Sequence, residues 1–248
     1  MSCTDLLTWY LRHHVAVLDI RSAEFRRAWG EVVPSGYTVS TCLHRLVAGG
    51  RLRRIARGIY LVVDTVRETP VAAIASGVFS QVPHYLTTDG ALAQHGLLDQ
   101  PVTTLTVVLS HMRRPIQLDF VTVIRPVTLD ERRLSTADAY GSTVEGFAVR
   151  LASREQAVLD ALAEPHWMVY GDLLPEILRA FSDDELARTA TGALGRTVAA
   201  AQRLGYLLEE AGRLAPPALA ELRPVRAVRL RPQKPTRGPY SSRWRVYG

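Results

Sequence analysis

The chain has 248 residues, of which 47% are hydrophobic and 22% charged, so it holds enough apolar material for packed domains and is not a disordered protein. Its net charge is +6, with nine arginines against five acids in residues 1–64, thirteen against nineteen in residues 65–221, and seven arginines plus Lys234 against none in residues 222–248. No run approaches the ~20 apolar residues of a membrane span and no signal-peptide pattern opens the chain, so we expect a cytoplasmic protein with no membrane contact.

Three short helices and a hairpin are predicted in residues 1–66. Apolar spacing predicts a helix over residues 4–13, and Ser22 is a plausible cap for a second helix that closes at Gly30. A third helix is expected after a Pro-Ser-Gly turn, from Tyr37 to a double glycine, followed by a hairpin in residues 51–62 around an Arg-Gly turn. This order is typical of a winged helix-turn-helix domain, in which the third helix enters the major groove of DNA.

The predicted third helix has one apolar face and one polar face. The apolar face comprises Val39, Cys42, Leu43, Leu46 and Val47. No acid occurs from Val32 to Val63, which favours contact with phosphate. The predicted DNA-binding residues are Thr38, Ser40, Thr41, His44, Arg45, Arg51, Arg53, Arg54 and Arg57. Arg45 is the best candidate for a guanine contact. The alternative is that these arginines only solvate one face of a small helical domain.

Residues 67–248 are predicted to form a mixed α/β domain, which makes the fold class α+β. Helices are expected at residues 70–79, 87–95, 153–163, 171–181, 183–193 and 195–205, and strands at 105–109 and 118–124. Ser153 and Ser182 are each predicted to begin a capping box. The basic tail is either a solvated segment or, as we favour, a strand with Trp244 and Val246 facing the core.

No catalytic residue, metal site or cofactor is predicted. Cys3 and Cys42 are too few for a metal cage or a disulfide framework, and the chain lacks the Gly-Lys pair of a phosphate loop. A nuclease interpretation starts from Asp119 on a predicted strand, but the only lysine, Lys234, has a proline where the partner acid would stand. We therefore expect that the protein is not an enzyme. The alternatives are a DNA-targeted nuclease and a winged-helix protein-interaction module.

Several segments, taken in order, resemble the AbiEi family of abortive-infection antitoxins. The family's glycine, leucine and Arg-Gly-Val-Tyr-like hairpin end are matched by Gly50, Leu52 and residues 57–60. Residues 85–97 are similar to a family segment that contains Ala-Leu followed by His-Gly-Leu. Residues 152–160 are similar to a family helix that ends in Leu-Asp, and residues 243–246 are similar to a Trp-containing strand near the family's C-terminus. Arg154 stands where the family commonly has proline.

The resemblance implies a transcriptional autorepressor and antitoxin of a type IV toxin–antitoxin system. Such a protein binds operator repeats in double-stranded DNA near its own promoter. It also counteracts a nucleotidyltransferase toxin encoded beside it, which would be its cognate partner.

Overall fold

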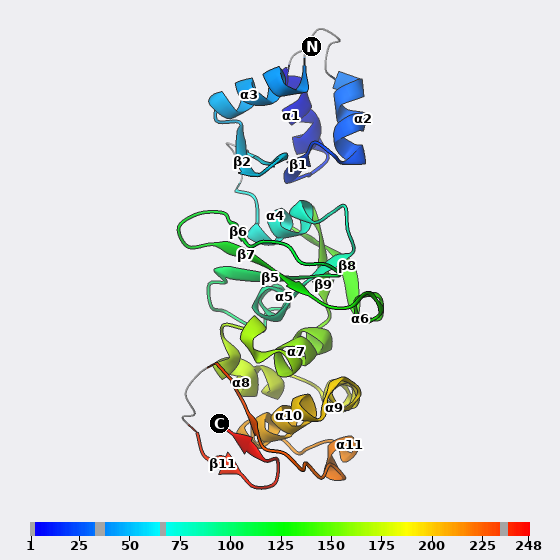
Figure 1. Cartoon of the computed structure of the whole chain (residues 1–248), viewed down its shortest axis with the longest axis vertical. Helices are drawn as coiled ribbons and strands as arrows, with labels where there is room; N and C mark the ends of the chain where they lie inside the picture. The colour runs from blue at the N-terminus through cyan, green and yellow to red at the C-terminus, as the bar shows by residue number, and fades with distance from the viewer. Residues whose placement is uncertain (1–2, 33–37, 65–67, 234–237) are drawn as a thin grey trace. The chain divides into compact units, whose positions relative to one another are not determined.

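The computed structural model describes residues 3–32, 38–64, 68–233 and 238–248, which form a mixed α/β structure (Figure 1). This confirms the predicted mixture of helices and strands. The chain divides into two compact units: unit 1 comprises Met1–Leu86, Val107–Ser135 and Tyr140–Leu151, and unit 2 comprises Thr87–Thr106, Thr136–Ala139 and Ala152–Gly248. The predicted boundary between residues 66 and 67 lies outside the described residues.

Unit 1 begins with three helices and three strands in the order α1, β1, α2, α3, β2, β3. Their bounds are α1 (Cys3–Arg12), β1 (Val17–Asp19), α2 (Ala23–Val32), α3 (Val39–Ala48), β2 (Leu52–Ala56) and β3 (Ile59–Val62). The strands form an antiparallel sheet in the order β1-β3-β2. The predicted helices and hairpin are present, but β1 was not predicted. The predicted Pro-Ser-Gly turn and Tyr37 lie outside the described residues.

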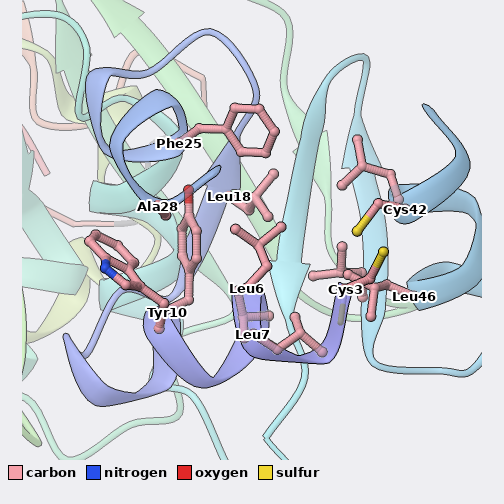
Figure 2. Close-up of a cluster of buried hydrophobic side chains, with 13 residues drawn as sticks. Cys3, Leu6, Leu7, Tyr10, Leu18, Phe25, Ala28, Cys42 and Leu46 are labelled. Atoms are coloured by element: carbon pink, nitrogen blue, oxygen red, sulfur yellow. The ribbon is translucent and has the colours of Figure 1, made fainter. Parts of the chain in front are cut away.

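A small hydrophobic core joins these first elements (Figure 2). Leu6, Leu7 and Tyr10 of α1 are buried against α2, α3 and the sheet, and each buried leucine contributes about 1.5–3 kcal/mol. Figure 2 shows the sulfur atoms of Cys3 and Cys42 facing each other in this core, where both cysteines are free thiols. Burial, followed by the hydrogen bond to Cys3, raises the pKa of Cys42 to about 12. The two thiols are therefore part of the contact between α1 and α3.

Helix α2 begins where the sequence predicts and ends later. The Ser22 hydroxyl oxygen accepts a hydrogen bond from the backbone N–H of Phe25 at 2.9 Å, as a helix cap does. The prediction that this helix closes at Gly30 is wrong, because α2 continues to Val32. The indole N–H of Trp9 donates to the carboxylate of Glu31 at 2.8 Å and ties the additional turn to α1.

A six-stranded sheet in the order β6-β7-β5-β4-β9-β8 lies largely in unit 1. The strands are β4 (His84–Thr87), β5 (Thr104–Leu109), β6 (Ile116–Gln117), β7 (Val123–Thr128), β8 (Ala139–Val144) and β9 (Phe147–Ala152), and unit 1 also holds α4 (Val71–Val78) and α6 (Glu131–Ser135). Strand β5 confirms a prediction, whereas β4, β8 and β9 were not predicted. The strand predicted at residues 118–124 begins too early: β7 starts only at Val123, because Asp119 closes a turn by accepting hydrogen bonds from the backbone N–H groups of Val121 and Thr122.

Unit 2 is mainly helical. Its elements are α5 (Thr88–Gln94), α7 (Arg154–Ala163), the 3-10 helices η1 (Pro165–Trp167) and η2 (Gly171–Leu173), α8 (Leu174–Arg179), α9 (Asp183–Arg196), α10 (Val198–Glu210), α11 (Pro217–Ala220), and the short strands β10 (Val228–Arg229), β11 (Tyr240–Ser241) and β12 (Val246–Tyr247). The capping box at Ser182 is confirmed. Ser153 caps α7, but the Gln156 amide donates to Asp160 instead of completing a box.

The tail packs against helix α10 within unit 2, with the burial pattern that the strand interpretation predicts. Trp244 is 1% exposed and Val246 is fully buried, while Arg243 and Arg245 point outward. The regular strand is shorter than predicted, because residues 242–245 form a turn and only Val246–Tyr247 are extended. Three strands pair here, with β12 between β10 and β11.

Candidate nucleic-acid interface

Helix α3 presents one face to the core and the opposite face to solvent. Cys42, Leu43 and Leu46 are buried, and Val39 is half-buried. Val47 was predicted on the buried face, but it is 39% exposed and belongs to the outer surface. The apolar face is therefore narrower than the sequence suggests, and the surface open to a partner is wider.

Both ends of α3 are fixed by local hydrogen bonds. The Thr38 hydroxyl oxygen accepts from the backbone N–H of Thr41 at 3.2 Å, which caps the start of the helix. At the other end Gly50 has φ +67°, its N–H donates to the carbonyl of Val47, and the N–H of Arg51 donates to that of Leu46. This pair of hydrogen bonds is a Schellman motif, which requires a residue such as glycine in the left-handed region. The helix is thus held at a defined length and leads directly into β2.

The five predicted residues of α3 and its cap are all exposed: Thr38, Ser40, Thr41, His44 and Arg45. Ser40 and His44 are four positions apart, so they lie on the same side of the helix. The hydroxyl groups of Thr38 and Thr41 are 2.8 Å apart and bond to each other. These two hydroxyls serve the helix cap, whereas Ser40, His44 and Arg45 lie on the exposed side of the helix body, from which side chains can reach base edges.

The hairpin of β2 and β3 carries the other predicted arginines. Arg53 and Arg54 are both exposed although they are neighbours, because β2 is an edge strand whose pairing shifts between Arg54 and Ala56. Arg57 is exposed at the turn, where Gly58 has φ +75°. Arg51 is half-buried and its Nε is enclosed without a hydrogen-bond partner. The structure thus places eight of the nine predicted residues on the surface.

A second basic segment, not predicted to contact DNA, follows β5. Arg113 and Arg114 are exposed in the loop that leads to β6, and strand β6 contacts β2 of the hairpin. The run His-Met-Arg-Arg was visible in the sequence, but nothing there indicated that the strand after it contacts the hairpin. An acid, Asp119, follows β6 and is close enough to the hairpin for the charge of Arg53 to act on it. Its pKa is lowered mainly by the hydrogen bonds from the N–H groups of Val121 and Thr122, and also by the charge of Arg53.

The described residues of unit 1 also hold a buried polar pair and a cleft. The Ser76 hydroxyl and the Nε2 of His84 are 2.8 Å apart, and the Nδ1 of His84 bonds the carbonyl of Val82. Burial lowers the pKa of His84, which keeps the ring neutral. Both residues line a cleft of about 410 Å³ together with His13, His14 and Arg150. Within residues 3–32, 38–64, 68–233 and 238–248, no three His, Cys, Asp or Glu side chains gather as metal ligands would.

Comparison with known proteins identifies a fold and no family. No protein-family model matches the chain, and no curated protein matches it. Among solved structures, the crystal structure of the RV2827C protein from Mycobacterium tuberculosis is similar, with a TM-score of 0.67 and 16% sequence identity over 98% of this chain and 90% of that one. At this identity the likeness shows a shared fold alone. In the described part of the chain, no helix has the length and apolar character needed to cross a membrane.

Proposed function

We propose that this protein binds double-stranded DNA through a winged helix-turn-helix formed by α1 to β3. The observation that carries the proposal is the surface shared by α3 and the β2–β3 hairpin, where eight polar or basic residues are exposed along a segment without acids. The order of three helices followed by the β2–β3 hairpin supports this domain class, and β1 adds a third strand that pairs with β3. In this arrangement α3 reads base edges in the major groove and the hairpin arginines contact phosphates.

The roles of autorepressor and antitoxin are proposed on the resemblance to the AbiEi family. In these roles the bound DNA would be operator repeats upstream of the protein's own gene. The protein partner would be a nucleotidyltransferase toxin encoded next to it. The buried core of α1 to α3 supports the DNA-binding part only, because it presents α3 as a rigid element.

The test is binding of the purified protein to labelled DNA from upstream of its own gene, against a scrambled competitor at two salt concentrations. We expect specific retention that weakens as salt rises. Arg45→Ala should lower the preference for the operator by about 1–3 kcal/mol, since a guanine contact discriminates by that amount. The matched control is Arg133→Ala, which removes an exposed arginine from α6 of the same unit.

Two outcomes would contradict the proposal. One is the absence of binding to either DNA at low salt, which would favour a protein-interaction module. The other is metal-dependent cleavage of plasmid DNA, which would favour the nuclease alternative. Binding that discriminates equally well after Arg45→Ala would contradict the assignment of Arg45 to a base contact.

A further inference from the structure

The turn between β6 and β7 presents an exposed aromatic side chain on a rigid backbone. Phe120 is fully exposed and Val121 is 63% exposed. The carboxylate of Asp119 accepts hydrogen bonds from the N–H groups of Val121 and Thr122 at 2.8 and 2.7 Å, and the Gln117 amide donates to the carbonyl of Asp119. Leu118, the residue before Asp119, is buried and anchors the turn. Phe120 is therefore held out in solvent by an ordered turn.

This turn lies beside the candidate nucleic-acid interface. Strand β6, which leads into the turn, contacts strand β2 of the hairpin, and the charge of Arg53 acts on Asp119. Arg113 and Arg114 are exposed just before β6. The apolar tip thus follows one end of β6 beside β2 with its exposed arginines, and the loop with Arg113 and Arg114 precedes the other end of β6.

We propose that Phe120 is an apolar wedge that inserts between base pairs of the bound DNA, next to the segment that α3 reads. The inference rests on the proposed DNA-binding function and extends it to a second contact. Proteins that bend DNA often insert Phe, Leu, Ile, Met or Pro side chains into a base step, which unstacks the bases and kinks the duplex. Arg53, whose charge acts on the turn, holds a phosphate beside the inserted ring.

The charges around the tip favour DNA over a second copy of this chain as the occupant. Arg53 and Arg54 are exposed on β2, the strand that contacts β6, and the charge of Arg53 acts on Asp119 next to the tip. The carboxylate of Asp119 is itself engaged by backbone N–H groups. Two copies that met through Phe120 would bring these arginines together and repel each other. A polyanion gains from the same arrangement.

The experiment measures the fluorescence of 2-aminopurine, a base analogue, placed at successive positions within and beside the operator sequence. It compares the full chain with Phe120→Ala. Unstacking at the inserted step should raise the fluorescence of the base analogue with the original chain and not with Phe120→Ala. The affinity of Phe120→Ala should be about tenfold lower. Leu214→Ala, which shortens a side chain that is 91% exposed in unit 2, is the matched control and should behave like the original chain.

A second aromatic variant and the oligomeric state separate the remaining explanations. Phe120→Trp should retain the fluorescence increase, because indole also stacks on bases. DNA binding without any fluorescence increase, or an increase that persists in Phe120→Ala, would overturn the wedge and leave the proposed function in place. A dimer that Phe120→Ala converts to a monomer would also overturn it in favour of a second copy. No DNA binding by the original chain would remove both proposals.

Discussion

The salt dependence of DNA binding gives the most direct test of the hairpin's role, and Arg53→Ala together with Arg54→Ala is the change that isolates it. Both side chains are exposed on the edge strand β2, so their removal leaves no cavity in the core. Each phosphate contact contributes about −0.9 to the slope of log affinity against log salt concentration. Loss of both contacts should make the slope about 1.8 less steep.

This change in slope corresponds to a measurable difference in affinity. Between about 50 and about 200 mM salt, the affinity of the original chain should fall about 12-fold more than that of the variant. Fluorescence anisotropy with a labelled duplex at several salt concentrations gives both slopes. The control is Arg132→Ala with Arg133→Ala, which removes the same charge from the exposed surface of α6 in the same unit. An unchanged slope in the β2 variant, or an equal change in the control, would refute a direct contact between the hairpin and phosphate.

Two further predictions concern stability. Gly205→Ala should lower the free energy of unfolding by about 1–3 kcal/mol in a urea titration, because the added methyl would overlap the buried ring of Trp244. The control is Gly195→Ala, whose added methyl meets no neighbouring atom within 4 Å and should not lower the free energy of unfolding. Burial lowers the pKa of His84, so the folded protein binds a proton there less readily than the unfolded chain. The contribution of neutral His84 to the free energy of unfolding should therefore be fully present above the unfolded-state pKa of about 6.5 and should decrease as the pH falls from that value towards the folded-state pKa. His84→Gln should flatten this decrease, and an equal decrease in both proteins would show that other groups cause it.

Local signals predicted the parts of the interface that local hydrogen bonds determine. Gly49 and Gly50 correctly mark the end of α3, since the left-handed φ of Gly50 is needed by the motif found there. The Arg57–Gly58 turn likewise marks the hairpin, and the arginines around it are exposed as the charge pattern indicates.

The features that depend on distant partners could not be predicted. Strand β1 has only three residues, and its partner is β3, where Val17 pairs with Leu61. So short a segment shows no alternation of its own. The β-prone run from residue 118 reads as a strand, yet the side chain of Asp119 turns the backbone before β7 begins. The placement of this turn beside β2 follows from sheet packing, which no single segment encodes.

The buried thiols of Cys3 and Cys42 give this chain a native reporter of its own opening. They are the two cysteines of the sequence, and both lie in the core that supports α3. The thiolate is the form that attacks a thiol reagent, and it is scarce at neutral pH when the pKa of Cys42 is about 12. The reagent also cannot enter a closed core. The rate of labelling therefore measures how often the first helices separate, so slower labelling in the presence of DNA would report ligand binding without any introduced probe.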